Sequence, residues 1–325
     1  MKFPRRQFLQ LAAGAALLPA VSSIAKAQGY PARPIRLIIG YTPGGSADLT
    51  ARLMGQWLSE RLGQSFVIEN RPGGGTNIAT EAAVRADPDG YTFLLVAPAN
   101  AINATLYSKL NFNFLRDIEP VAGIIRFPNV VVVNPSLPIK SISELIAYAK
   151  ANPGKLSFSS PGVGSASHLA GEMLKTMAGI DMVHVPNKGM SPAVLDVIGG
   201  QVQVVFASVP SIVKQKPEHL RPIAMAEMKR SALLPDLPTI NESGLPGFAV
   251  ANWAGLLGPA GLDPKIVKKL HDEIIAIIAT AEMKERIKTL GYDLIESSPE
   301  QFATDLRADI ERWGPVAKRA GVSVK

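Results

Sequence analysis

Short apolar runs alternate along the chain with amphipathic stretches whose apolar residues recur at helical spacing. This alternation is typical of βα units, in which helices connect the strands of a mostly parallel sheet. Several helix starts have explicit signals: Ser141-Ile-Ser-Glu144 and Ser298-Pro-Glu-Gln301 are capping boxes, and Asp263 precedes a first-turn proline. From about Asp263 onward the pattern predicts helices almost throughout. The runs predicted as strands are 35–41, 66–70, 91–97, 129–134, 156–160, 182–186, 202–208 and 220–227.

An internal similarity indicates how these units are organised. The strand at 35–41 leads into Thr42-Pro-Gly-Gly-Ser-Ala47 and a helix, and the strand at 156–160 leads into Ser160-Pro-Gly-Val-Gly-Ser-Ala166 and a helix. The two prolines are 118 residues apart (161 − 43), and the second turn has one extra residue. That spacing is too long for a solenoid repeat but suits one copy in each of two lobes. A chance similarity between two glycine-rich turns is the alternative.

The segments near 125–129 and 248–253 are extended and apolar, without a flexible Gly/Ser linker. They predict two ordered hinge crossovers between the lobes. Residues 28–127 and 250–325 are expected to form a discontinuous first lobe, and residues 128–249 the second. The predicted fold is therefore α/β and two-lobed, with a mostly parallel sheet in each lobe and a cleft between them.

The two glycine turns are candidate anion sites. The first amides of a helix lack partners and lie at the positive end of the helix dipole, so they attract carboxylate or phosphate. Glycines allow the backbone to approach a ligand closely, and Ser46 and Ser165 add hydroxyl donors. The first turn lacks the Gly-Lys-Ser/Thr ending of phosphate-binding loops and is not G-x-G-x-x-G. These turns therefore predict a carboxylate rather than a nucleotide.

Other candidates lie beside these turns and keep two interpretations each. Asp48, four residues before Arg52, either forms a helical ion pair or orients waters or an amine in the cleft. Lys188 either balances a ligand carboxylate or is a solvated turn residue. The glycine turn that ends at Asn77 is either another ligand loop or a tight βα turn. Ala97 and Asn100 follow a strand whose carboxyl end is expected to face the crevice.

Composition narrows the function classes. The net charge is +7, but residues 1–27 hold four basic residues and no acid, so the rest of the chain carries 7 − 4 = +3. This mild charge gives no reason to expect a nucleic-acid partner. The absence of cysteine excludes disulfides, thiolate metal sites, a catalytic thiol and a lipid-anchored N-terminus. The four histidines lack metal-binding spacing and no G-x-S-x-G motif occurs, so neither a cofactor nor catalysis is predicted.

Residues 1–27 are predicted to be an export signal. They contain a positive N-terminal region, the apolar stretch LAAGAALLPAV and a small-residue cleavage site at Ala25-Lys-Ala27. The apolar stretch is shorter than the about 20 residues that span a bilayer, so no membrane insertion is expected. Arg5-Arg6 is typical of a twin-arginine signal, with an ordinary secretory signal as the alternative. The mature chain is expected to start at about Gln28 and to reside in the periplasm.

The chain resembles the Bug receptors, the periplasmic solute-binding proteins of the tripartite tricarboxylate transporter class. The resemblance covers essentially the whole mature chain and depends on many motifs together. These motifs are Pro43-Gly-Gly with Asp48 and Ala51-Arg52, Glu69-Asn-Arg-Pro-Gly, Asp87-Pro-Asp-Gly-Tyr91-Thr, Gly162 and Gly164-Ser with His168-Leu-Ala-Gly-Glu172, Val185-Pro-Asn-Lys-Gly189, Pro192-Ala, Gly199-Gly-Gln-Val202 and Leu237-Pro-Thr-Ile-Asn-Glu-Ser-Gly244.

The resemblance implies a Venus-flytrap receptor, not an enzyme, that binds a small carboxylate in the interlobe cleft and delivers it to inner-membrane transporter subunits. It also implies a monomer without a cofactor. The ligand contacts that it implies are Tyr41, Thr42, Gly44, Gly45 and Asp48 in the first lobe, and Gly164, Ser165, His168, Pro186, Asn187, Lys188 and Gly189 in the second.

Two departures from the family leave the ligand's identity open. Asn187 and Gln203 stand where the family commonly has tyrosine and aspartate, respectively. The alternative function is a secreted α/β enzyme that acts on a small carboxylate-containing substrate, but the sequence shows no nucleophile–base pair in a recognisable context. A scaffold or sensor without a cleft ligand is a third possibility.

Overall fold

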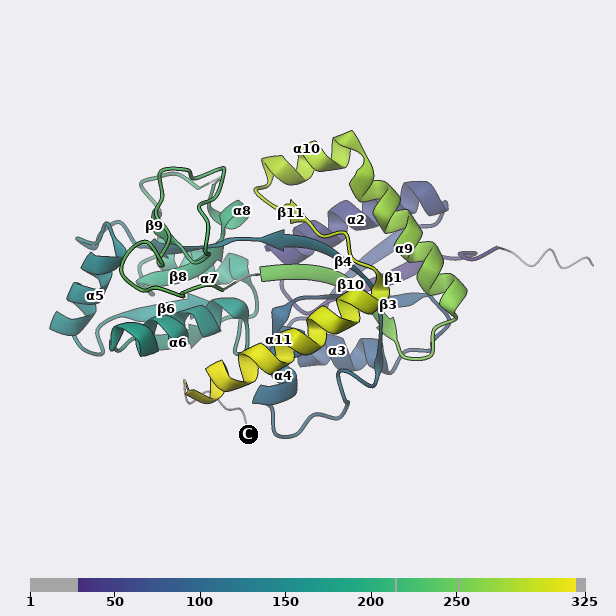
Figure 1. Ribbon diagram of the computed structural model, residues 1–325, viewed down its shortest axis with the longest axis horizontal. Coiled ribbons are helices and arrows are strands. Elements are labelled where there is room, and N and C mark those ends of the chain that lie inside the picture. Colours follow the sequence, from purple (N-terminus) through teal and green to yellow (C-terminus); the bar gives the residue numbers. More distant parts are fainter. Residues whose placement is uncertain (1–28, 214, 251, 320–325) are drawn as a thin grey trace, which may run out of the picture.

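Two sheets lie one after the other along the long axis of the molecule, each flanked by helices (Figure 1). The computed structural model describes residues 29–213, 215–250 and 252–319, so the predicted export signal lies outside the described residues. The strand order is β11-β4-β10-β3-β1-β2 in the first sheet and β7-β6-β8-β5-β9 in the second. We call the two halves built on these sheets the first and second lobes. The two-lobed fold predicted from the sequence is confirmed.

The strands of the first lobe are β1 (Ile35–Ile39), β2 (Phe66–Asn70), β3 (Thr92–Val96), β4 (Ile118–Phe127), β10 (Asn252–Pro259) and β11 (Asp293–Leu294). Those of the second lobe are β5 (Asn129–Val133), β6 (Ser157–Ser160), β7 (Val183–Pro186), β8 (Val204–Ser208) and β9 (Arg221–Met225). All eight predicted strands are present. The predictions missed β4, β10 and β11.

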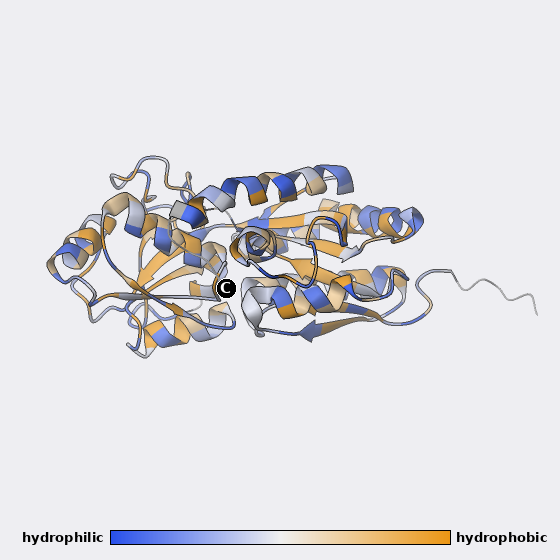
Figure 2. Cartoon of the chain, turned by 90° about the horizontal axis from the view of Figure 1, so that it is seen from below, coloured by the Kyte–Doolittle hydropathy of each residue, from blue (hydrophilic) through white to orange (hydrophobic). Residues whose placement is uncertain are grey.

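The helices are α2 (Ser46–Leu62), α3 (Asn77–Val84), α4 (Pro98–Leu106), α5 (Ile142–Ala151), α6 (Ala166–Ala178), α7 (Met190–Ile198), α8 (Val209–Ile212), α9 (Pro264–Ala279), α10 (Ala281–Thr289) and α11 (Pro299–Arg319), with a short 3₁₀ turn η2 (Gly74–Thr76). The predicted capping serine Ser141 accepts a hydrogen bond from the Glu144 amide at 3.2 Å, and Ser298 accepts one from Gln301 at 3.1 Å. The hydrophobic strands lie inside, and the outward helix faces are hydrophilic (Figure 2). None of the helices in the described ranges has the length and apolar character needed to cross a membrane.

Each sheet is mixed rather than mostly parallel. In the first, β1 pairs in parallel with β2 and β3, whereas β10 is antiparallel to both β3 and β4. In the second, β6 pairs in parallel with β7 and β8, whereas β5 is antiparallel to β8 and β9. The reversal has a simple cause: β5 and β10 are the strands by which the chain enters a lobe from the other, so they run against the strands that end at the cleft.

The lobes are joined by more than the two predicted crossings. Only Pro128 separates β4 from β5, and the returning chain enters β10 at Asn252, whose side-chain amide donates a hydrogen bond to Asn129 Oδ1 at 3.1 Å. Helix α11 forms a further connection, because Phe302 packs in the first lobe while Trp313 belongs to the core of the second. Figure 1 shows α11, in yellow, extending from one lobe toward the other. The end of α11 thus departs from the predicted assignment of 250–325 to the first lobe.

Candidate functional site

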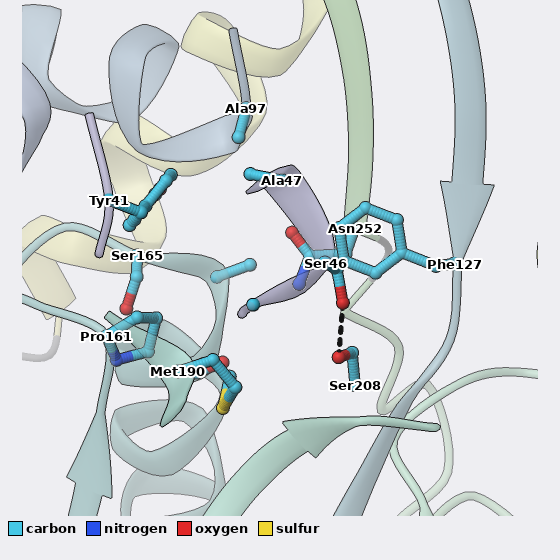
Figure 3. A pocket seen from close by; sticks show the side chains of 13 residues that line it. Tyr41, Ser46, Ala47, Ala97, Phe127, Pro161, Ser165, Met190, Ser208 and Asn252 are labelled. Atoms are coloured by element: carbon cyan, nitrogen blue, oxygen red, sulfur yellow. Dashed lines mark hydrogen bonds between the residues drawn. The ribbon is translucent and has the colours of Figure 1, made fainter. Parts of the chain in front are cut away.

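A cavity lies between the lobes where the carboxyl ends of strands from both sheets meet (Figure 3). The space between atoms in this region, open solvent included, is about 450 Å³. Both lobes and both crossings contribute to its wall. The lining residues are Tyr41, Gly45, Ser46, Ala47, Ala97, Phe127, Pro161, Ser165, Ala166, Ser167, Met190, Ser208 and Asn252.

The first-lobe wall is the start of α2. The helix begins directly after Gly45, which has no side chain to cap the first amides. Gly44 has a φ of 89°, a left-handed conformation that favours glycine. Its N–H donates to Asp48 Oδ2 at 3.0 Å, which keeps the turn folded back on the helix. The uncapped first turn of α2 therefore remains available to an anionic group.

The second-lobe wall is the start of α6. Ser165 caps this helix: its Oγ accepts a hydrogen bond from the His168 amide at 3.2 Å and donates one to the Gly162 carbonyl at 2.7 Å. The Ser165 hydroxyl is thus used inside the turn. Ser167 differs, because its Oγ is fully buried at the cavity and has no hydrogen-bond partner among the described residues. A buried hydroxyl of this kind is expected to have a partner, and a ligand in the cavity could provide it.

The lobes are closed on one another beside this cavity. Ser46 Oγ and Ser208 Oγ, on opposite sides of the cleft, are hydrogen-bonded at 2.5 Å. The Thr42 N–H donates to the Lys188 carbonyl at 3.1 Å. Ser191 Oγ donates to the Pro43 carbonyl at 3.2 Å. These contacts define the closed arrangement.

The polar side chains that line the cavity are hydroxyl and amide groups. Within the described residues, no lysine, arginine, histidine, aspartate or glutamate lines it. Burial raises the pKa of Tyr41 well above its ordinary value, so its phenol stays protonated. An anion in this cavity would therefore be held by amides and hydroxyls rather than by a cationic side chain.

The predicted site residues fall into three groups. Five line the cavity: Tyr41, Gly45, Ser46, Ala97 and Ser165. Others lie at the closed edges: Thr42 meets Gly189, Gly44 lies against Ser191, and Pro186, Asn187 and Lys188 line a neighbouring hollow with the glycines of η2. The rest hold the loops without lining the cavity.

Asp48 belongs to this last group. Its carboxylate accepts hydrogen bonds from Gly44 N–H, from Arg52 Nε at 2.9 Å and from Asn70 Nδ2 at 3.0 Å. Burial alone would raise the pKa of Asp48, but the bonds from Arg52, Gly44 and Asn70 outweigh it and hold the pKa below its ordinary value. The interpretation as an ion pair within the turn fits these contacts, whereas its side chain does not reach the cavity wall.

Three further candidates also act behind the wall. Asn100 Oδ1 accepts the Ala97 N–H at 2.9 Å and so shapes the start of α4. Asn77 Oδ1 accepts a hydrogen bond from Asn103 Nδ2 at 3.0 Å. His168 is 3% exposed, and its Nδ1 accepts a hydrogen bond from the Gly164 N–H at 3.2 Å, so it holds the turn from the protein interior.

The two departures from the family pattern lie outside the cavity wall. Asn187 Nδ2 donates to Asp196 Oδ2 at 2.6 Å and to Ser159 Oγ at 3.0 Å, so the amide points back into its own lobe. Gln203 Oε1 accepts hydrogen bonds from Ser157, at the start of β6 and therefore at the opposite end of this strand from the cleft.

Sequence reasoning missed eight lining residues: Ala47, Phe127, Pro161, Ala166, Ser167, Met190, Ser208 and Asn252. Some had a usable signal. Ser208 ends β8 just as Ala97 follows β3, and strand carboxyl ends face the crevice. Phe127 and Asn252 lie at the crossings that were already predicted. Met190 had none, because only lobe closure brings α7 beside Gly45.

Comparisons with known proteins agree on one family. The family model described as "Tripartite tricarboxylate transporter family receptor" matches residues 50–322. A protein from the tcbD-tcbE intergenic region of Pseudomonas sp. (strain P51) is 35% identical over 305 residues, 93% of this chain and 91% of the relative. BugT of Bordetella pertussis is 33% identical over 308 residues, 94% of each chain.

Solved structures are similar over nearly their whole length. R. palustris Rpa4515 with adipate superposes with a TM-score of 0.88 at 35% identity, covering 90% of this chain and 99% of that chain. The periplasmic binding protein BugD gives 0.86 at 32% identity, covering 91% and 100%. MatC from Rhodopseudomonas palustris with bound malate gives 0.84 at 28% identity, covering 88% and 99%.

Proposed function

This chain belongs to the tripartite tricarboxylate transporter receptor family, and from that premise we propose that it binds a dicarboxylate in the interlobe cavity. It is a periplasmic solute-binding receptor of a transport system rather than an enzyme, and the periplasmic binding protein BugD is among its structural relatives. The alternative of a secreted α/β enzyme has no support from these relatives.

One observation carries the proposal: the first turns of α2 and α6 open on the same cavity from opposite lobes. Each helix N-terminus is equivalent to roughly half a positive charge, with amides directed at the ligand. None of the described residues that line the wall carries a charge, so these two helix ends are the positive groups that face the cavity. The unpartnered hydroxyl of Ser167 adds a donor at the second end.

The distribution of polar groups favours a ligand with two polar ends. Ser46, Ser208 and Asn252 lie toward one end of the cavity, where the two lobes meet, and Ser165 lies toward the other end, with Ala47 and Met190 between them (Figure 3). A dicarboxylate with a short apolar middle matches this order. The relatives solved with adipate and malate hold ligands of the same class.

The remaining features of the receptor are proposals of the same kind. We propose that residues 1–27 direct export, and that the mature chain is a monomer that passes its ligand to the transporter's membrane subunits. We place the lobe boundaries at 28–127 with 250 onward, and at 128–249, with the end of α11 bridging the two.

A thermal-shift panel tests the function. For a micromolar ligand supplied at millimolar concentration, linkage predicts about 4 kcal/mol of stabilisation. Purified mature protein is expected to melt higher with adipate, malate or a related dicarboxylate, and to be unaffected by ATP. A shift with ATP alone would contradict the proposal. A panel without any shift would favour a scaffold or sensor, and turnover of carboxylate esters or amides would revive the enzyme.

A further inference from the structure

The two cavity turns share an arrangement at an offset of 120 residues (164 − 44). Gly44 and Gly164 both have left-handed backbones, with φ of 89° and 82°. In each turn the glycine N–H donates to the side chain four residues later: Gly44 to Asp48 Oδ2 at 3.0 Å, and Gly164 to His168 Nδ1 at 3.2 Å. We call this hydrogen bond the turn brace.

The two braces differ in charge. In the first lobe the acceptor is a carboxylate, and Arg52, four residues on, pairs with it at 2.9 Å. In the second lobe the acceptor is an imidazole, and the residue four positions on is Glu172, 3.9 Å away. A positive charge therefore balances the acceptor in the first lobe, whereas in the second lobe the acceptor itself must be neutral to accept the bond.

We propose that His168 is a positioning residue for the ligand: as a neutral acceptor it holds Gly164 and the first amides of α6 toward the cavity, and protonation of its ring releases them. The inference rests on the proposed function, since it assigns to His168 the geometry of one wall of that site. His168 is not among the residues that line the cavity. Its effect on the ligand must pass through the turn.

The surroundings of His168 keep the ring neutral. Its Nδ1 faces the Gly164 N–H, so a proton on Nδ1 would place two donors against each other. His184, from β7, stacks on it with ring centroids 3.8 Å apart. Burial, with a smaller contribution from the charge of Lys175, lowers the pKa of His168 to about 4. Glu172 is the acid beside the ring, but it is paired with Lys175 at 3.0 Å.

The second histidine extends the brace to the beginning of the turn. His184 Nε2 lies 2.7 Å from Ser160 Oγ, which also accepts the Gly162 N–H at 3.1 Å. Burial lowers the pKa of His184 to about 3, with smaller contributions from His168 and Lys175. The stacked histidines therefore hold both Gly162 and Gly164 in place, and both rings are neutral at pH 7.

Two substitutions separate the acceptor from the bulk of the side chain. In His168→Asn, the Oδ1 atom is the same number of bonds from the backbone as Nδ1 of histidine, so it can accept the hydrogen bond from the Gly164 N–H. His168→Leu fills the space without an acceptor and leaves a buried N–H unpaired. Calorimetry with adipate at pH 7 should show binding weakened about tenfold or more in the leucine variant and by less than about threefold in the asparagine variant.

A pH profile distinguishes this role from simple packing. The ratio of wild-type to His168→Asn affinity for adipate should be constant from pH 8 to pH 5 and fall as the pH approaches 4, where His168 gains its proton. Taking the ratio removes the titration of adipate itself. Equal affinities of the asparagine and leucine variants, or a flat ratio, would overturn the proposal.

A measurement without ligand keeps the proposal testable if the leucine variant fails to fold or adipate does not bind. Nitrogen-15 NMR of the histidine rings in ligand-free protein should show Nδ1 of His168 unprotonated, with titration near pH 4. Titration near the ordinary value of 6.5 would refute the brace. Absence of dicarboxylate binding together with the expected titration would contradict the proposed function and support the brace.

Discussion

Replacing Gly189 with alanine tests whether ligand binding requires the lobes to touch. The φ of Gly189 is 174°, an extended backbone that alanine adopts without strain, so the second lobe should fold normally. In the closed arrangement, however, an added Cβ would lie 1.9 Å from Thr42 Oγ1 and 3.0 Å from Thr42 N, across the cleft. The backbone nitrogen cannot move aside without moving the first-lobe turn. Alanine at this position should therefore hold the lobes apart.

The expected loss follows from the contacts that closure makes. Holding the lobes apart breaks three hydrogen bonds between them: Thr42 to Lys188, Ser46 to Ser208, and Ser191 to Pro43. At about 0.5–1.5 kcal/mol each, their loss costs about 1.5–4.5 kcal/mol. Binding should weaken by about ten- to a thousandfold, and loss of the second-lobe contacts to the ligand would add to this.

Calorimetry with the best dicarboxylate of the panel measures the effect, and the melting temperature without ligand serves as the control for folding. Thr42→Gly in the same chain removes the Cβ and the Oγ1 that the new methyl would meet and leaves only the 3.0 Å contact with the backbone nitrogen, so the double variant should recover part of the lost affinity. Wild-type affinity in Gly189→Ala, with an unchanged melting temperature, would show that the ligand binds without this closure and would refute the reasoning.

Four further predictions concern two residues of the cavity turns, one buried carboxyl group and the lobe boundaries. Asp48→Asn should lower the free energy of unfolding by about 1 kcal/mol through the weakened Arg52 pair, and it should change ligand affinity by less than about threefold at neutral pH. Because the pKa of Asp48 is lowered, the greater stability of the wild type in chemical denaturation should disappear as the pH falls below the ordinary value of 3.8. Ser165→Ala should cost about 1 kcal/mol of stability through the lost cap, seen as a lower melting temperature, and loosen ligand binding because the Gly162 carbonyl loses one of its donors. Burial raises the pKa of Glu227 to about 8, so its carboxylate destabilises the fold increasingly as the pH rises from 4.5 toward 8; Glu227→Gln should melt higher than wild type at pH 8 and equally at pH 4. Residues 28–127 alone should give an unfolded circular-dichroism spectrum, since β10, which lies between β3 and β4, is missing; a cooperative melt would contradict the lobe boundaries.

Strands with a local signal could be predicted from the sequence, whereas those defined by distant partners could not. The runs around Ile35 and Val130 are rich in branched apolar residues and are buried strands. β10 has the sequence NWAGLLGP, with two glycines and a terminal proline, which weakens any strand signal. Its extended form depends on β3 and β4 on either side, far away in the sequence. The mixed character of the first sheet follows from that insertion and was therefore missed together with it, whereas in the second sheet β5 was predicted but its antiparallel direction was not.

The alignment of the two glycine turns shows a limit of prediction from the sequence. The letters Gly-Ser-Ala occur at Gly45 and again at Gly164, but the conformational match is one residue earlier in the first turn, because Gly44 and Gly164 share the left-handed backbone. That shift gives the two serines different roles: Ser165 caps α6, whereas Ser46 is the first residue of α2 and reaches Ser208 in the other lobe. The shift could not be predicted, because either glycine of the first pair can adopt a positive φ. The hydrogen bond to the side chain four residues later selects Gly44, and it depends on folded geometry that the letters do not contain.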